Sequence, residues 1–466
     1  MPEKPISKKM SLTAAISMAV GTMIGASIFS IFGLGAEIAK QNLPFAFLLS
    51  AFYAMIVAYS YARMGSAIRS NAGPIAFILK GIGDNIVTGA LSILIWMINV
   101  VSIALFLQGF AGYFLPLLNF DPTNRLSLAI VAGIVIVIFT ALNFFGSKAV
   151  GKVEIFIVLI KLSILVVFII AGLTTLNVGN LKPSADSSAI SGTLHASVIF
   201  FLSYMGFGLI TNASENIKNS KKNVPRAIYL SIIIVSIVYI MVAITAIGNL
   251  QIPDLIKAQE NALAAAAKPV LGNFGYLLIS IGALFSISSA LNATIYGGAN
   301  IAYSLAKDGE LPEFFERKVW FKSTEGLYIT AGLALVFAIV FNIGEIASIT
   351  SSIFIIIYFF VLVSHFRRAK EYRGNRIILG INITILSAIF VASMYYQFTT
   401  QRVAFYGTII TLFVALVIEY LLRRFTVREF KVIEKTIEKD VKAVEKDVEK
   451  DVKAVEEDVK TIVEKL

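Results

Sequence analysis

Long apolar segments recur along the 466-residue chain and alternate with short polar connections. Most of them run for about 18 to 25 residues, and a helix of about 20 apolar residues crosses a hydrocarbon core of about 30 Å. Membrane barrel strands alternate over about 10 residues, which these segments do not. The pattern predicts an all-α integral membrane protein with 12 transmembrane helices. The predicted spans are residues 12–38, 44–66, 86–115, 126–146, 153–176, 192–213, 227–248, 272–303, 326–344, 346–366, 376–397 and 402–424.

Composition supports this class of protein. The chain is 57% hydrophobic and 15% charged, with a mean hydropathy of +0.82, whereas a soluble domain carries about 25% charged residues. A soluble globular or disordered protein is therefore excluded. The chain has no cysteine, which excludes disulfides, thiolate metal sites and a catalytic thiol. No small-residue cleavage site follows the first apolar segment, so we expect a retained helix rather than a signal peptide.

The basic residues predict the orientation of the chain. Alternate connections carry 25 Lys and Arg residues, whereas the remaining connections carry six. Cytoplasmic loops of membrane proteins are enriched in these residues, so we expect both termini in the cytoplasm of a multi-pass protein of the cell membrane. This topology accounts for the net charge of +11 without a nucleic-acid partner.

The C-terminal segment differs from the rest of the chain. Residues 434–466 hold eight Lys and eleven Asp or Glu, and residues 439–449 repeat as residues 450–460. An apolar period of 11 residues favours a helix with a slight right-handed supercoil. We expect residues 425–466 to form a charged cytoplasmic helical tail that membrane chemistry does not need. It either stays solvated or packs on a second copy or another cytoplasmic surface, so the protein is expected to be a monomer or a weak dimer.

Two spans carry glycine and small polar residues at mid-membrane depth, at residues 21–29 and 203–208. Glycine disfavours helix and lets the backbone open, and opened backbone is tolerated in a bilayer only against protein or a polar cavity. The two spans are the first of two sets of five, residues 12–176 and 192–366. Interrupted helices at matching places in two halves point to a transporter site. The alternative is close helix packing through small residues.

The ends of an opened helix suit a zwitterion. The new N-terminus offers N–H donors and a positive dipole end to a carboxylate, while the new C-terminus offers carbonyls to an ammonium. An α-amino acid carries both groups. We find no acidic residue at mid-membrane depth to receive a charged side chain, so neutral amino acids are expected.

Lys161 lies eight residues into its apolar span, or roughly 12 Å at 1.5 Å per residue. A charge at this depth is costly and should face the protein interior. A buried lysine can exchange a proton near neutral pH, which makes Lys161 a candidate proton carrier. The alternative is that its long side chain reaches back to the interface.

Other functional classes lack their usual residues. Two isolated histidines and no cysteine give no metal or acid–base cluster for an enzyme, so we expect no catalytic residues, no metal and no cofactor. We find no filter loop or charged ring typical of a channel, and no phosphate-binding glycine loop typical of a pump.

Five motifs carry a resemblance to a known family. They are residues 21–29, 71–74, 143–146, 203–225 and 307–312. In these residues, and over about residues 11–424, the chain resembles the APC superfamily of amino acid transporters. The resemblance implies a LeuT-type fold, in which two five-helix repeats are inverted relative to each other and spans 11 and 12, at residues 376–424, are peripheral.

The resemblance also implies a substrate site in the two interrupted spans. Its expected residues are Val20, Gly21, Ile24, Gly25, Ala26, Ser27, Phe201, Leu202, Tyr204 and Gly206. Backbone N–H groups of residues 25–27 would bind the carboxylate, carbonyls near residues 20–21 and 201–202 the ammonium, and Phe201 or Tyr204 would close over the substrate. Many relatives carry an acidic residue where this chain has Gly208, so a proton route through that position is not expected here.

The resemblance also implies which residues couple transport to a cation or a proton, because their positions match those of the coupling site in relatives. In sodium-coupled relatives a cation lies between spans 1 and 8, and in a proton-coupled relative a lysine of span 5 occupies that place. Lys161 matches it, with Gly21, Ser286 and Ser289 as its partners, and Glu215 matches a gating glutamate. We therefore expect a proton-coupled, sodium-independent symporter of neutral L-amino acids. An exchanger or uniporter, or a sodium-coupled transporter of the same fold, are the alternatives.

Overall fold

The structure is a computed structural model, which describes residues 10–68, 73–144, 150–307 and 311–425. Within these ranges the regular structure is helical, joined by turns and irregular connections, and two isolated bridges pair Met10 with Ile217 and Lys318 with Thr324. The predicted tail lies outside the described residues except at its start. Parts of three motifs, at residues 71–72, 145–146 and 308–310, also lie outside them, as does most of the N-terminal segment.

Sixteen α-helices are found in this part of the chain. In order they are α1 (Leu12–Met23), α2 (Ala26–Ala39), α3 (Leu43–Ala67), α4 (Pro74–Ile82), α5 (Ile86–Leu117), α6 (Arg125–Asn143), α7 (Val150–Thr174), α8 (Ser187–Phe201), α9 (Gly208–Asn212), α10 (Ser220–Asn249), α11 (Ile252–Lys257), α12 (Ala262–Lys307), α13 (Glu325–Val340), α14 (Ile343–Arg367), α15 (Arg376–Thr400) and α16 (Arg402–Phe425). Within the described residues, ten helical segments are long and apolar enough to cross a membrane, and α1 and α13 are shorter apolar helices. The predicted class of all-helical membrane protein is confirmed.

Asparagine begins several of these helices. The side chains of Asn85, Asn124 and Asn375 accept backbone N–H bonds in the first turns of α5, α6 and α15. Asn342 forms a reciprocal capping box with Glu345 at the start of α14. Caps of this kind satisfy N–H groups that a helix leaves without a partner. These caps fix the residue at which each of these apolar helices begins.

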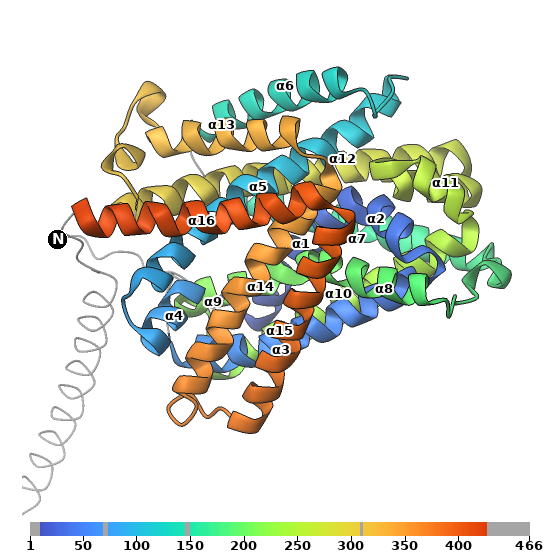
Figure 1. Cartoon of the computed structure of the whole chain (residues 1–466). Coiled ribbons are helices and arrows are strands. Elements are labelled where there is room, and N and C mark those ends of the chain that lie inside the picture. The colour runs from blue at the N-terminus through green and yellow to red at the C-terminus, as the bar shows by residue number, and fades with distance from the viewer. Residues whose placement is uncertain (1–9, 69–72, 145–149, 308–310, 426–466) are drawn as a thin grey trace, which may run out of the picture.

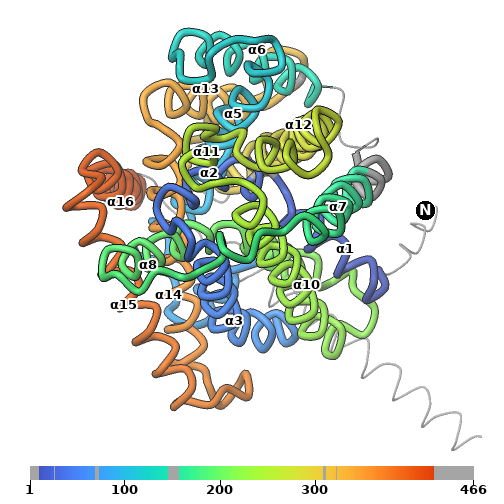
Figure 2. The backbone as a smooth tube through the Cα atoms, turned by 90° about the vertical axis from the view of Figure 1, so that its right-hand side faces the viewer, coloured from blue at the N-terminus to red at the C-terminus, as the bar shows by residue number. Residues whose placement is uncertain are grey.

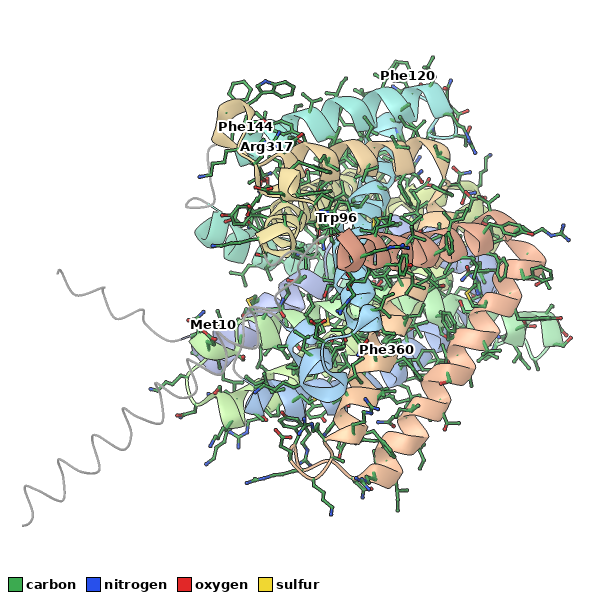
Figure 3. The ribbon with its side chains drawn as sticks, turned by 60° about the vertical axis from the view of Figure 1, so that its left-hand side comes forward. Met10, Trp96, Phe120, Phe144, Arg317 and Phe360 are labelled. Carbon is green, nitrogen blue, oxygen red and sulfur yellow. The ribbon has the colours of Figure 1, made fainter. Side chains whose placement is uncertain are left out.

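Helix α5 runs through the middle of the bundle, where it packs against α12, α13, α14 and α16 (Figure 1). In its most apolar window 78% of residues are buried, compared with 22% in α6 at the edge. The indole of Trp96, which is labelled in Figure 3, donates to the Thr330 hydroxyl at 3.0 Å and joins α5 to α13. The helices α1, α7 and α10 lie beside one another on another side of the bundle (Figure 2).

The outer helices expose apolar side chains along one face. On α6 the exposed residues recur at helical spacing and are 53–70% exposed: Leu126, Ile130, Ile134 and Val137. A contiguous apolar surface of this kind is expected against lipid rather than water. The exposed face of α6 therefore supports a membrane-embedded bundle.

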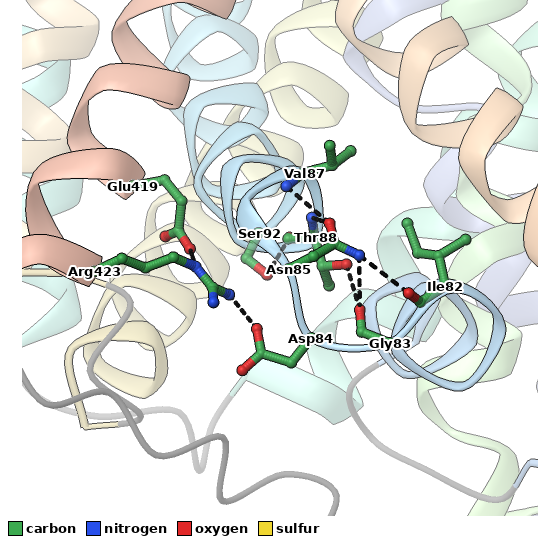
Figure 4. Close-up of polar contacts among 9 residues, drawn as sticks. All are labelled: Ile82, Gly83, Asp84, Asn85, Val87, Thr88, Ser92, Glu419 and Arg423. Carbon is green, nitrogen blue, oxygen red and sulfur yellow. Dashed lines mark hydrogen bonds and ion pairs between the residues drawn. The ribbon is translucent and has the colours of Figure 1, made fainter.

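An ion-pair cluster ties α16 to the turn between α4 and α5 (Figure 4). The Arg423 guanidinium donates to Glu419 at 2.6 Å and also bonds Asp84. Glu419 is fully buried, and an added Cβ at Gly89 on α5 would lie 2.1 Å from its carboxylate. Absence of a side chain at Gly89 thus lets α16 approach α5 closely.

Candidate transport site in an interrupted helix

The first apolar span is interrupted at residues 24–25. Helix α1 ends at Met23 and α2 begins at Ala26, while Ile24 (ψ 60°) and Gly25 (φ −108°, ψ −145°) leave the helical conformation. A Cβ at Gly25 would lie 2.8 Å from the Thr22 carbonyl oxygen, so the turn has no room for a side chain. The interruption lies within the glycine segment singled out in the sequence. Gly25, the N-cap of α2, gives that helix no side-chain cap for its first N–H groups.

The second interrupted span differs from the expectation. Instead of opening, residues Leu202–Phe207 tighten into a 3-10 helix between α8 and α9. The backbone angles of Phe201, Leu202 and Gly208 stay helical. A 3-10 segment keeps a carbonyl partner three residues back for each N–H, so it needs fewer outside partners at this depth. A run of six such residues inside a span is unusual and typical of a hinge.

The two irregular segments lie against each other. A Cβ at Gly206 would lie 2.8 Å from the backbone nitrogen of Met23 and 3.0 Å from Thr22 Cβ. The buried hydroxyl of Tyr239 on α10 lies within hydrogen-bond distance of the Met23 carbonyl and, at 3.3 Å, of the Ser203 carbonyl. Sequence reasoning missed Tyr239. The sequence feature that could have indicated this residue is a tyrosine in the middle of the apolar segment 227–248.

The predicted aromatic residues of the site are fully buried. Phe201 packs edge-on against Tyr53 with ring centroids 6.2 Å apart, and lies 5.5 Å from Tyr358. Tyr204 donates its hydroxyl to the Phe47 carbonyl at 3.2 Å and contacts Tyr239 edge-on. Tyr204 thereby lies next to Tyr239, which contacts both irregular segments.

Lys161 lies next to the interruption. Its side chain on α7 is 4% exposed, and its Nζ donates to the Gly21 carbonyl oxygen on α1. A Cβ at Gly21 would lie 2.3 Å from Val158 Cγ2, so only glycine allows this close approach of α1 to α7. Val20 and Ser27, on either side of the interruption, are also buried.

Ser286 on α12 is fully buried, and its Oγ has no hydrogen-bond partner within the described residues. Helix α7 packs on α12, where a Cβ at Gly282 would lie 2.7 Å from Ile164 Cδ1. Ser286 lies one turn beyond Gly282, and Lys161 lies one turn before Ile164. Ser286 and Lys161 therefore each lie one turn from this contact between α12 and α7, and half-buried Ser289 follows Ser286 one turn later.

The beginning of α1 is joined to the chain that follows α9. Met10 N donates to the Asn216 carbonyl at 2.7 Å, and Lys218 N donates to the Met10 carbonyl at 2.9 Å. Glu215 is half-buried in the short turn Ser214–Asn216 beside these bonds. The candidate gating residue thus lies where the ends of the two irregular spans meet.

A cavity of about 500 Å³ is lined by residues of α2 and by none of α1. It begins at Ser30, one turn beyond Ser27, and holds the polar groups Glu37, Gln108 and Glu260. None of the ten residues predicted for the substrate site lines it. Within the described residues, no group of three or more His, Asp or Glu could hold a metal ion.

Comparison with known proteins agrees with these features. A family model described as amino acid permease matches residues 10–418. An uncharacterized protein of Methanocaldococcus jannaschii is 63% identical over 91% of this chain and 97% of its own length. The inner membrane transport protein YbaT of Escherichia coli is 31% identical over 90% and 97%. The branched-chain amino acid permease BcaP of Bacillus subtilis is 22% identical over 66% and 69%. The chain belongs to the amino acid permease family of the APC superfamily.

Proposed function

We propose that this permease is a proton-coupled, sodium-independent symporter of neutral L-amino acids that works by alternating access. The single observation that carries the proposal is the buried Lys161 ammonium donating to the Gly21 carbonyl, one turn before the interruption of the first span. A buried charge in a membrane is costly and usually functional. In this position it can respond to protons and act on the substrate site at once.

The interruption would bind the substrate backbone. The first N–H groups of α2, at residues 25–27, receive no side-chain cap from Gly25 and would bind a carboxylate at the positive end of the helix. The Val20 carbonyl accepts the Ile24 N–H at 2.8 Å, and the Gly21 carbonyl accepts Lys161. Each carbonyl oxygen has a second lone pair, which leaves it able to accept from a substrate ammonium.

Side-chain selectivity would follow from the surroundings of the interruption. The groups found around it are apolar side chains, hydroxyls of Ser27, Tyr204 and Tyr239, and the ammonium of Lys161. A cationic substrate side chain would meet Lys161 instead of a carboxylate. Neutral amino acids are therefore the proposed substrates, and the ammonium would also repel a sodium ion from the same position.

Proton coupling would proceed through the link between α7, α1 and α12. With Lys161 protonated, its N–H groups would bond the Gly21 carbonyl and the unsatisfied Ser286 hydroxyl, holding the three helices together while substrate binds. Loss of the proton to the cytoplasm would weaken that link. The two bonds between Met10 and the segment after α9 would then break as the inner end opens, beside Glu215.

The same proposal includes 12 spans, of which α1 with α2 and α8 with α9 each form one interrupted span. Two inverted sets of five would cover residues 12–176 and 192–366, followed by two peripheral spans. Both termini would lie in the cytoplasm of a cell-membrane protein, as the 25 Lys and Arg residues of alternate loops favour.

Uptake into vesicles tests the function. Purified protein in proteoliposomes should accumulate labelled alanine, serine or glutamine when an inward proton gradient is applied, equally with and without sodium. Collapse of the gradient with an uncoupler should stop accumulation. Accumulation that needs sodium, or exchange alone under every gradient, would contradict the proposal of proton symport.

A further inference from the structure

A second cavity, of about 530 Å³, lies between the end of α3, the start of α10 and the connection from α14 to α15. Its charged wall consists of Arg63, Lys221 and Arg373 together with Glu371. We propose that this basic cavity binds the phosphate headgroup of an anionic membrane lipid. The inference is independent of the transport cycle proposed above.

The cavity is positively charged overall. Glu371 lines the cavity, but its carboxylate pairs at 3.3 Å with the guanidinium of Arg368, which does not line it. Among the residues that the structure describes, no carboxylate pairs with Arg63, Lys221 or Arg373. Three cations facing one space without neutralising partners repel one another, and an anion between them removes that repulsion.

Arg63 is held by its neighbours in the fold, and Lys221 lies at the start of a helix. The Arg63 guanidinium lies over the Tyr59 ring, 5.5 Å from its centroid, and the Tyr59 hydroxyl accepts the Asn375 N–H at 3.0 Å. Lys221 belongs to the first turn of α10, whose positive dipole end adds to the attraction for an anion. All three basic residues are exposed, so they are accessible to an anion, and Arg63 is held in place by the Tyr59 ring.

Its position favours a lipid over a free anion. Next to Tyr229, which lines the cavity, α10 exposes Leu230 at 42%, Ile233 at 43% and Ile237 at 59%. This apolar face runs from the cavity along the helix, where acyl chains would lie. Arg63, Lys221 and Arg373 also lie in or beside loops of the Lys- and Arg-rich set, which the orientation proposed above puts at the cytoplasmic surface, where basic pockets bind anionic headgroups.

Thermal unfolding of the full chain in detergent tests the proposal. Phosphatidylglycerol should raise the unfolding midpoint saturably, whereas phosphatidylcholine at the same concentration should not. In the variant Arg63→Gln/Lys221→Gln/Arg373→Gln, we expect phosphatidylglycerol to bind roughly tenfold to hundredfold more weakly, because each basic residue near an anionic surface contributes about a fivefold change in affinity.

A matched variant separates the cavity from general surface charge. Lys222→Gln/Arg226→Gln/Arg367→Gln removes the same charge from exposed residues outside the cavity, and should keep the wild-type response. Lys221→Glu provides a second cavity variant at an exposed helix start, where a glutamate is tolerated, and should also lose the response. An unchanged response in both cavity variants, or an equal loss in the matched variant, overturns the proposal. Stabilisation by inorganic phosphate equal to that by phosphatidylglycerol overturns the assignment to a lipid.

Discussion

Contact between Lys161 and Gly21 depends on residue types at two positions. A glycine in α1 lets the backbone approach Val158 of α7, and a lysine one turn further along α7 then donates to the buried Gly21 carbonyl. The lysine was predictable, because a charge eight residues into an apolar span is conspicuous. Tyr239 and the unsatisfied Ser286 hydroxyl were harder to find, since their roles depend on which helices become neighbours.

Close contact at Gly206 gives a prediction at the residue scale. Gly206→Ala should reduce transport roughly tenfold or more and destabilise the fold by about 1–3 kcal/mol, because the new Cβ would lie 2.8 Å from the Met23 backbone nitrogen, which cannot easily move. Uptake assays and thermal unfolding in detergent measure the two effects. Gly208→Ala is the matched control, since its Cβ would lie 3.6 Å from the Tyr61 ring, an ordinary contact. Equal effects of the two substitutions would count against this reading of Gly206.

Hydrophobic segments predicted the helical elements well, but their ends less well. Helix α10 begins at Ser220, several residues before its apolar segment does, because a helix propagates through charged turns once its apolar part is packed. In α12 the backbone leaves the helical conformation at Gly272 (φ 63°, ψ −155°), so the part that follows agrees with the predicted span 272–303, and the helical turns from Ala262 to Leu271 were not predicted. The short α4 was missed, since it lies in a connection. The 3-10 segment of Leu202–Phe207 was also missed, because glycine permits both an opened and a tightened backbone.

The cluster that ties α16 to α5 gives a prediction at the scale of elements. Arg423→Gln should lower stability by roughly 1–3 kcal/mol, since it removes the cation bonded to the buried Glu419; Arg423 is partly exposed, so the loss stays below that of a fully buried pair. The unfolding midpoint measures it. Arg368→Gln removes one exposed ion pair, with Glu371, and should change stability by less than about 1 kcal/mol. A larger loss from Arg368→Gln than from Arg423→Gln would contradict this account of the cluster.

At the scale of the whole molecule, burial separates a packed centre from a lipid-facing rim. The contrast between α5 and α6 follows from which helices surround each of them, and residue composition alone does not distinguish the two, because both are strongly apolar. Orientation, in contrast, is predicted by the loops alone. The absence of cysteine from the chain makes that prediction simple to test.

Single cysteines report which side each loop faces. Thr123→Cys, in the connection between α5 and α6, should react with a membrane-impermeant maleimide on intact cells, because its loop belongs to the side that is poor in Lys and Arg. Lys370→Cys, between α14 and α15, should react only after the membrane is opened. Both positions are exposed, so access from the correct side decides labelling. The reverse pattern would show that the termini face outward.

The central claim is that Lys161 carries the coupled proton. The most direct measurement compares proton-driven accumulation of labelled alanine with gradient-free exchange, in proteoliposomes that contain wild type, Lys161→Ala or Lys182→Ala. The last variant removes an exposed lysine of a loop and should behave as wild type. We predict that Lys161→Ala loses proton-driven accumulation while it keeps exchange, because the interrupted helix still binds substrate without the proton-dependent link to α7. Proton-driven accumulation by Lys161→Ala at the wild-type level would contradict the account.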